Sequence, residues 1–333
     1  MPKLPSVEEL AAGVKLADRA SLGRAISLVE SEHPAHRQLA EDLLNALSDV
    51  SSNCWRIGVT GVPGAGKSTF LEQLGLYITR ERKEKVAVLA VDPSSPISGG
   101  SILGDKTRMN DLAREERAFI RPSPSGGSLG GIAKRSYETL RICEAAGFDY
   151  CFIETVGVGQ SEALVKKLSD VMLLLLITGA GDQLQGIKRG IMELADIILI
   201  NKADGDNAIP AKRALAEIRQ AVQLLPDPEH GKPVVSDMCS SLSASGMENV
   251  WKHLFTFFQY TQASGWKEQN RRSQTHFWIR SNLEDALLHE LRTWLKKDEK
   301  ALALMSQSNQ ISPFSLSMKL LELFEKRDQQ QFL

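Results

Sequence analysis

Between residues 55 and 239, short apolar runs alternate with longer segments whose apolar residues recur at helical spacing. The runs are WRIGVTG, KVAVLAVD, FDYCFIET, VMLLLLIT, DIILINK and PVVSDMC. Strands separated by helices usually pair in parallel, because each helix carries the chain back across one face of the sheet. VMLLLLI is apolar throughout, as in a strand covered on both faces, and it is far too short to span a bilayer. The alternation predicts an α/β fold with a mostly parallel central sheet covered by helices.

The two ends of the chain follow a helical pattern instead. Residues 1–50 are predicted to form an N-terminal helical extension, and the alternating domain occupies residues 51–262. In residues 263–333, leucines recur at every fourth position from Leu283 to Leu295. Such a short helical region cannot make a large core alone, so we expect it to pack on the main domain or on a second copy of the chain.

Net charge and cysteine content limit which partners and which compartment are expected for the protein. A net charge of -1 provides no overall field that would attract nucleic acid or an anionic membrane, and we predict neither as a partner. Cys54, Cys143, Cys151 and Cys239 form no CxxC pair, which favours reduced thiols. The N-terminal stretch MPKLPSVEEL has neither the apolar core of a secretory signal nor the Arg-rich character of a transit peptide. We therefore expect a cytoplasmic protein.

The first apolar run continues into a motif of the form GxxxxGK[ST]. In such a motif, glycines let the backbone approach a polyphosphate, and N–H groups at the helix start supply positive potential. Lys67 would reach the terminal phosphates, and the hydroxyl of Ser68 would bind Mg²⁺. A glycine-rich turn could match by chance, but this one follows a predicted strand and opens a predicted helix. The motif residues are Gly61, Val62, Pro63, Gly64, Ala65, Gly66, Lys67, Ser68 and Thr69.

The sequence INKADGD indicates which base is bound. It contains Asn201-Lys202-Ala203-Asp204 at the end of a predicted strand. The Asp204 carboxylate can accept hydrogen bonds from N1–H and the 2-amino group of guanine, donors that adenine lacks. The alternative is an ordinary strand-to-loop turn with surface charges, but the position after the phosphate loop favours GTP and GDP as the nucleotides.

The Ser-rich sequence CSSLSASG follows the next predicted strand. Guanine-binding proteins place a loop here whose backbone N–H contacts the guanine oxygen, although Ser-rich loops are also common without any ligand. The candidates are Ser240, Ser241 and Leu242.

Two acidic residues lie at the ends of predicted strands. Asp92 ends KVAVLAVD, and Glu154 lies near the end of FDYCFIET, shortly before Gly157. Because ligands bind beyond the carboxyl ends of parallel strands, both carboxylates are expected near the phosphate loop, where they would hold Mg²⁺ or position water. The N–H of Gly157 could sense the γ-phosphate. Alternatively, Asp92 only caps a turn and Glu154 is a buried structural acid.

A third glycine-rich segment, GAGDQLQGIKRG, occupies residues 179–190. Its glycines surround Asp182, Gln185 and Lys188, which favours a segment that changes conformation. A turn followed by a helix start would produce the same composition.

Taken together, several blocks of the sequence resemble the methylmalonyl-CoA mutase-associated GTPases, the MeaB/ArgK family of P-loop GTPases of the SIMIBI class. The blocks are GVPGAGKST, AVDPSSPISGGSILGDKTRM, IRPSPSGGSLGG, IETVGVGQSE, GDQLQGIKRGI and NKADGD. Similarity extends over nearly the whole chain. Two residues depart from the family pattern: Ser241 stands where alanine is usual, and Gln183 stands where many relatives have an acid.

The resemblance implies a GTPase that acts as a chaperone of an adenosylcobalamin-dependent acyl-CoA mutase, gating cofactor loading and protecting the mutase. It also implies a homodimer formed through the C-terminal helices. By the same resemblance, Asp105 joins Asp92 and Glu154 in the Mg²⁺ and water shell, and residues 179–190, with Lys188, form a switch that responds to the partner.

The predicted reaction is in-line attack of water on the γ-phosphorus, with Lys67, Mg²⁺ and loop N–H groups stabilising the transferring group. No side chain is an obvious strong base, so we expect slow turnover until the mutase binds. Three alternatives remain open: a metallochaperone-type GTPase, a nucleotide-dependent kinase linked to amino-acid transport, and a GTP-binding scaffold without catalysis. The first would require a His/Cys cluster, and the close pair His33 and His36 lies in the helical extension.

Overall fold

The computed structural model describes residues 5–31, 33–50, 53–91, 109–121, 131–155, 161–178, 189–306 and 311–327. The chain divides into two compact units, residues 1–274 and residues 275–333. Within the described ranges, no helix is both long enough and apolar enough to cross a membrane.

The first unit is built on a sheet in which the described strands follow the order β3-β2-β4-β1-β5-β6-β7. All neighbouring strands are parallel, as predicted. The sequence missed β3, which lies at the sheet edge with only Ala118 of its four residues buried and whose apolar run, Ala118 to Ile120, is only three residues long. The strands are β1 (Trp55–Gly61), β2 (Val86–Val91), β3 (Ala118–Arg121), β4 (Tyr150–Thr155), β5 (Val171–Ile177), β6 (Ile197–Asn201) and β7 (Val235–Met238).

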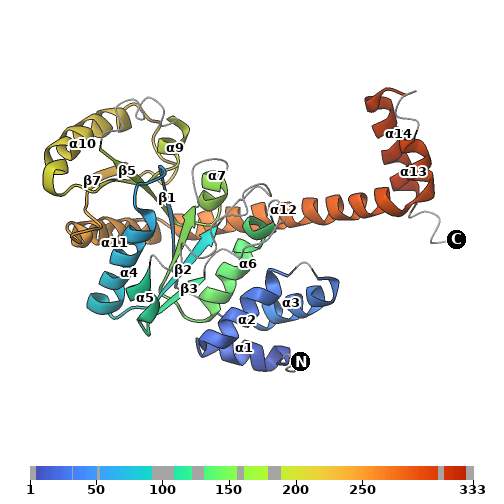
Figure 1. Ribbon diagram of the computed structural model, residues 1–333, viewed down its shortest axis with the longest axis horizontal. Coiled ribbons are helices and arrows are strands. Elements are labelled where there is room, and N and C mark those ends of the chain that lie inside the picture. The colour runs from blue at the N-terminus through green and yellow to red at the C-terminus, as the bar shows by residue number, and fades with distance from the viewer. Residues whose placement is uncertain are drawn as a thin grey trace. The chain divides into compact units, whose positions relative to one another are not determined.

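Helices cover both faces of this sheet (Figure 1). One face packs against α4 (Lys67–Tyr77), α5 (Asn110–Arg114) and α11 (Met247–Ala263). The opposite face packs against the remaining crossover helices, because strands β5 and β6 are apolar on both sides. These helices are α6 (Gly131–Ala145), α7 (Ser161–Lys166), α9 (Arg189–Glu193) and α10 (Ala208–Val222).

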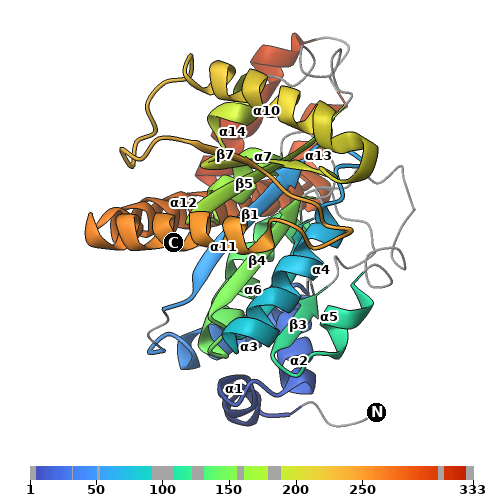
Figure 2. The same cartoon turned by 90° about the vertical axis from the view of Figure 1, so that its left-hand side faces the viewer.

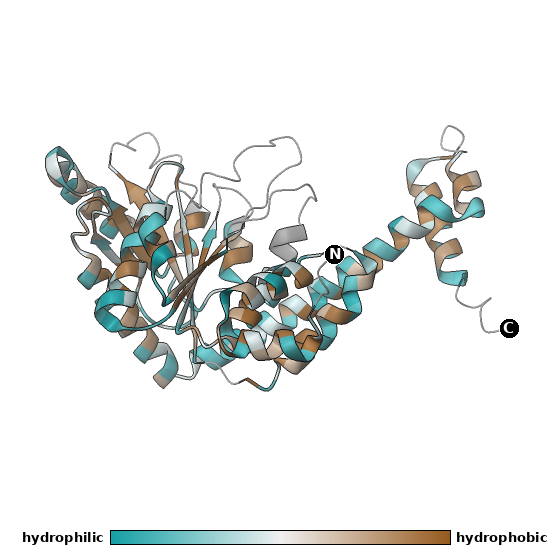
Figure 3. Cartoon of the chain, turned by 60° about the horizontal axis from the view of Figure 1, so that its bottom comes forward, coloured by the Kyte–Doolittle hydropathy of each residue, from teal (hydrophilic) through white to brown (hydrophobic). Residues whose placement is uncertain are grey.

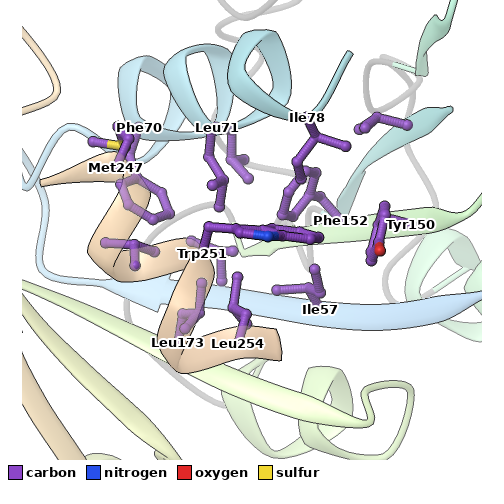
Figure 4. Packing of buried hydrophobic residues seen from close by; sticks show 14 of the residues in the cluster. Ile57, Phe70, Leu71, Ile78, Tyr150, Phe152, Leu173, Met247, Trp251 and Leu254 are labelled. Carbon is purple, nitrogen blue, oxygen red and sulfur yellow. The ribbon is translucent and has the colours of Figure 1, made fainter. Parts of the chain in front are cut away.

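Trp251 of α11 lies at the centre of the larger core (Figure 4). Its indole packs edge-on against the ring of Tyr150, with ring centroids 5.2 Å apart, and lies near Phe70 and Leu71 of α4. Side chains of this size each contribute about 1.5 to 3 kcal/mol when fully buried. Colouring by hydropathy shows the apolar character concentrated on the central strands and on the inner faces of the helices (Figure 3). This packing holds α4, and with it the glycine-rich loop, against the sheet.

The predicted N-terminal helices are α1 (Val7–Lys15), α2 (Arg19–Val29) and α3 (Pro34–Ala46). Ser6 and Glu9 form a capping box that starts α1, and the Asp18 side chain accepts a hydrogen bond from the N–H of Ser21 to start α2. The three helices pack against one another and on α6. Their buried residues include Leu10, Val14, Leu22 and Ile26.

A buried ionic network ties the start of α12 (Trp266–Lys297) to the sheet. Arg56 of β1 makes a two-pronged contact with Glu144 of α6, at 2.7 and 2.9 Å, and Arg271 of α12 pairs with Asp170 at 2.7 Å. Burial alone would raise the pKa of Glu144, but Arg56, Arg271 and Arg141 lower it to about 2. The charged carboxylate is therefore part of the stable fold.

The second unit contains the remainder of α12, α13 (Glu299–Met305) and α14 (Pro313–Lys326). Its small core consists of Ala301, Leu316 and Leu320, with Trp294 and Phe324 packed edge-on at 5.2 Å. Many large apolar side chains of this unit are nevertheless exposed: Ile279, Leu283, Leu287, Leu288, Leu302, Met305, Phe314, Met318 and Leu321.

Candidate nucleotide-binding site

The glycine-rich loop connects β1 to α4 as the sequence predicts. Gly66 is the residue before α4 and has φ +83°, a left-handed conformation that favours glycine. A Cβ atom there would lie only 3.0 Å from the Asn201 side-chain nitrogen. The ammonium of Lys67 donates to the carbonyl of Gly61 at 2.9 Å, so it folds back over the loop. A helix start and an ammonium group at one loop form an arrangement that can bind phosphate.

Two oxygen groups that the sequence assigns to Mg²⁺ lie side by side. Ser68, in the first turn of α4, donates its hydroxyl hydrogen bond to Glu154 Oε1 at 3.0 Å. Glu154 is only 5% exposed and lies opposite Val59 in the pairing of β4 with β1. A hydroxyl and a carboxylate beside a phosphate loop suit Mg²⁺, which prefers oxygen ligands and retains several waters. The residues therefore fit this ion.

The phosphate loop and the base-recognition loops are joined by Asn201. This residue ends β6 and is fully buried. Its side-chain nitrogen donates to the carbonyl of Ala65 at 2.8 Å, and its oxygen accepts hydrogen bonds from the N–H and the hydroxyl of Ser241 at 3.0 and 2.8 Å. The hydroxyl of Ser241 thus adds a second donor to Asn201, beside the backbone N–H.

Ser240 orients the carboxylate predicted to recognise guanine. Its hydroxyl donates to Asp204 Oδ2 at 2.7 Å and accepts from the N–H of Ser243 at 3.2 Å. Ser240 is buried, whereas Asp204 is partly exposed. The sequence assigned only the backbone N–H of Ser240 to the site, and this hydroxyl contact has no signature of its own in the sequence.

The surrounding backbone keeps these loops together. The N–H of Ala203 donates to the carbonyl of Cys239 at 3.0 Å, and the N–H of Cys239 donates to that of Ile200 at 2.9 Å. Lys202 adopts φ +59°, unusual for a residue with a side chain. The side chain of Leu242 is 85% exposed.

The remaining predicted site residues divide into those that the structure describes and those that it does not. Val62 is partly buried against the core and Ala65 is buried, whereas Pro63, Gly64 and Thr69 are exposed. Asp92, Asp105, Gly157 and Lys188 lie outside the described residues, as do Asp182 and Gln183.

The structure also places one buried pair that the sequence did not single out. Thr155 of β4 donates its hydroxyl hydrogen bond to the Thr60 hydroxyl of β1 at 3.1 Å. Both threonines are fully buried. Threonine is common in strands for reasons of packing alone, so the sequence provides no signal for this contact.

A parallel sheet whose first strand runs through a glycine-rich loop into a helix beginning with lysine and serine defines the class of P-loop nucleotide-binding proteins. The family model described as methylmalonyl Co-A mutase-associated GTPase MeaB matches residues 22–296. The chain belongs to this family of GTPases, which confirms the resemblance seen in the sequence.

Individual relatives agree with this assignment. The chain is 49% identical to GTPase ArgK of Escherichia coli (strain K12) over 279 residues, which are 84% of each chain. It is 41% identical to the mitochondrial methylmalonic aciduria type A homolog of Mus musculus over 335 residues, covering 96% of this chain and 80% of that one. A crystal structure titled LAO/AO transport system kinase has a TM-score of 0.74 and 37% identity, covering 97% of this chain and all of the other.

Proposed function

We propose that this protein hydrolyses GTP to GDP and phosphate, and that this cycle serves an adenosylcobalamin-dependent acyl-CoA mutase of the methylmalonyl-CoA mutase type. The observation that carries the proposal is the contact of Asn201 with both Ala65 and Ser241. It joins the phosphate loop to the loops that carry Asp204 and Ser240. One nucleotide can therefore occupy both parts of the site in a single defined geometry.

Base selection rests on Asp204. With Oδ2 engaged by Ser240, the carboxylate has a restricted orientation and retains acceptor capacity for guanine N1–H and the 2-amino group. Adenine offers no matching donors, so its binding would leave a desolvated carboxylate unsatisfied. Sites built in this way can discriminate by up to about 10⁴-fold.

Phosphate binding and hydrolysis rest on the start of α4. The ammonium of Lys67 can leave the Gly61 carbonyl for the β- and γ-phosphate oxygens. Ser68 and Glu154 would hold Mg²⁺, together with Asp92 and Asp105, and bound Mg²⁺ would neutralise charge that develops on the phosphates. Water attacks the γ-phosphorus in line, and the N–H of Gly157 is proposed to contact the γ-phosphate. Lys188 is proposed to act in catalysis as part of the switch formed by residues 179–190.

Association with the mutase is inferred from the family, whose description names that enzyme. We infer that the protein acts as a chaperone of the mutase, controlling cofactor loading and protecting the enzyme, in the cytoplasm. We also infer a homodimer formed through residues 263–333. On α12, Ile279, Leu283 and Leu287 are 62%, 58% and 51% exposed at four-residue spacing, which is a stripe suited to a second apolar helix.

The test is phosphate release from GTP by the purified full chain, measured with Mg²⁺ and with or without methylmalonyl-CoA mutase. We expect slow release that the mutase accelerates, and no comparable release from ATP. Equal use of ATP would contradict the guanine assignment. Transfer of the γ-phosphoryl group to protein instead of water would favour the kinase alternative.

A further inference from the structure

The side-chain oxygen of Asn201 has more hydrogen-bond donors around it than it needs. It accepts from the N–H of Ser241 at 3.0 Å, from the hydroxyl of Ser241 at 2.8 Å and from the thiol of Cys239 at 3.7 Å. An amide oxygen has two lone pairs, so two donors are enough to satisfy it. One donor is therefore surplus, and Ser241 supplies two of the three.

All three residues are shielded from solvent. Asn201 is fully buried, and Ser241 and Cys239 are each only 3% exposed. Burial raises the pKa of the Cys239 thiol to about 12, so this thiol keeps its hydrogen at neutral pH. A thiol is nevertheless a weak donor, and a buried position gives water little chance to replace a lost hydrogen bond. The oxygen of Asn201 therefore depends mainly on Ser241.

The backbone N–H groups of this loop differ in how firmly they are engaged. The N–H of Ser240 donates to the carbonyl of Ser245 at 2.9 Å, a contact that closes the loop between β7 and α11. The N–H of Ser241 instead donates to the oversupplied oxygen of Asn201. Of these two candidates for the guanine oxygen, the N–H of Ser241 is the one that can be released without breaking the loop.

The two donors of Ser241 are not equivalent once a base is considered. A backbone N–H carries one hydrogen, so it cannot make a full hydrogen bond both to Asn201 and to the 6-oxo oxygen of guanine. If the base takes the N–H, Asn201 keeps the Ser241 hydroxyl, which is the closer of the two donors. Without that hydroxyl, only the weak Cys239 thiol would remain, and a poorly satisfied buried acceptor would oppose binding of the base.

The main chain of the loop is held without help from the Ser241 side chain. The loop between β7 and α11 can be followed in Figure 2. At its end Gly246 has φ +82°, a conformation that favours glycine. A Cβ atom there would lie 2.9 Å from the Met238 carbonyl oxygen, so the loop packs directly on the end of β7. Removing the Ser241 hydroxyl should therefore leave the backbone in place.

We propose that Ser241 determines specificity at the 6-position of the base: its hydroxyl satisfies Asn201 and thereby releases its own N–H to the 6-oxo oxygen of guanine. The proposal rests on the guanine-nucleotide function proposed above. It adds to Asp204, which is assigned to N1–H and the 2-amino group and is held through Oδ2 by Ser240. The two edges of the base are thus read by separate groups.

The experiment measures Kd by calorimetry for three nucleoside diphosphates, with the full chain and the variants Ser241→Ala, Ser241→Cys and Ser245→Ala. GDP is compared with 6-thioguanosine diphosphate, in which sulfur, a weak acceptor, replaces only the 6-oxo oxygen. It is also compared with inosine diphosphate, which lacks only the 2-amino group. The readout is the ratio of the Kd for each analogue to the Kd for GDP, because a ratio cancels losses that affect all nucleotides equally.

In the parent chain, the 6-thio analogue should bind about fivefold to tenfold more weakly than GDP, as expected for one weakened hydrogen bond. Ser241→Ala should raise the Kd for GDP about tenfold and bring the 6-thio ratio below about twofold, because Asn201 then retains the N–H. Its inosine ratio should equal the parental ratio, since Asp204 is unchanged. Ser241→Cys should give an intermediate 6-thio ratio, because a thiol is a weaker donor than a hydroxyl.

Ser245→Ala removes an exposed hydroxyl from the same loop and should match the parent chain with all three nucleotides. A parental 6-thio ratio in Ser241→Ala would contradict this role of Ser241 even if overall affinity fell, because a purely structural role weakens both nucleotides alike. If Ser241→Ala does not fold, a parental 6-thio ratio in Ser241→Cys would contradict the role in the same way. A parent chain that binds adenosine diphosphate as tightly as GDP would overturn the proposed function, and this role with it.

Discussion

The side-chain nitrogen of Asn201 donates a hydrogen bond to the carbonyl of Ala65 across 2.8 Å, joining β6 to the phosphate loop over 136 positions of sequence. Since Asn201 also accepts two hydrogen bonds from Ser241, a single buried amide connects three segments of the site.

Asn201→Ala should weaken GTP binding strongly. The substitution leaves the Ala65 carbonyl and both Ser241 donors without their partner, and each buried group left unsatisfied costs about 1 to 3 kcal/mol. We expect the Kd for GTP, measured by calorimetry, to rise at least about tenfold, which corresponds to 1.4 kcal/mol. Asn45→Ala on the exposed surface of α3 is the matched control and should bind normally. Unchanged affinity in Asn201→Ala would show that the loops hold their positions without this amide.

Asp204→Asn should change the preferred base. The amide nitrogen would face donors of guanine, whereas xanthine offers an oxygen where guanine has its amino group, so affinity should move from GTP toward xanthosine triphosphate. We expect GTP affinity to fall roughly a hundredfold, within the discrimination available to such sites. Asp206→Asn, an exposed neighbour, controls for lost charge. Competition between the two triphosphates measures the effect, and an unchanged preference would exclude Asp204 as the base-recognition residue.

Ser68→Ala should impair Mg²⁺-dependent hydrolysis in a chain that still folds. It removes the hydroxyl that contacts Glu154 and that is assigned to Mg²⁺. We expect kcat for GTP to fall about tenfold or more, equivalent to at least 1.36 kcal/mol in the barrier, with a higher Mg²⁺ requirement. Ser273→Ala, an exposed serine of α12, should behave as the parent chain. An unchanged Mg²⁺ requirement in Ser68→Ala would show that Ser68 is not a ligand of the proposed Mg²⁺.

Acid should destabilise the first unit through Glu144. Its pKa is lowered from 4.5 to about 2 in the fold, so its stabilising contribution is complete above about pH 4.5 and is lost as the pH falls toward 2. The shift corresponds to about 3 kcal/mol.

Urea unfolding of Glu144→Gln, compared with the parent chain between about pH 5 and pH 3, measures this contribution. The variant should be less stable at the higher pH and should lose less stability on acidification. Glu284→Gln, in an exposed pair with Arg280, controls for carboxylates in general. Parallel pH profiles for Glu144→Gln and the parent chain would contradict the assignment.

Leu283→Asp should disrupt the proposed homodimer. The substitution puts a charge into the exposed stripe of Ile279, Leu283 and Leu287, and burying an unpaired carboxylate at an interface is costly. Sedimentation should show a dimer for the parent chain and for the exposed control Arg292→Asp, but a monomer for Leu283→Asp. A monomeric parent chain, or a Leu283→Asp dimer of undiminished stability, would rule out this interface.

The fold was predictable because its central strands are buried on both faces. A strand such as Val171–Ile177 can be recognised from its own residues, since every position is apolar. Strand β3 was not predictable, because Phe119, Ile120 and Arg121 lie at an edge where half-burial permits mixed residue types.

The amino-acid sequence by itself predicted the chemistry of the site. The glycine-lysine-serine motif and the tetrad ending in Asp204 are local patterns, and each works through residues adjacent in sequence. Tertiary structure alone decided which distant groups support them: Asn201 with Ala65, and Ser240 with Asp204. The physical reason is that a hydrogen bond depends on the distance between two groups in space, and periodicity along the chain carries no information about which loops the folded sheet brings within 3 Å of each other.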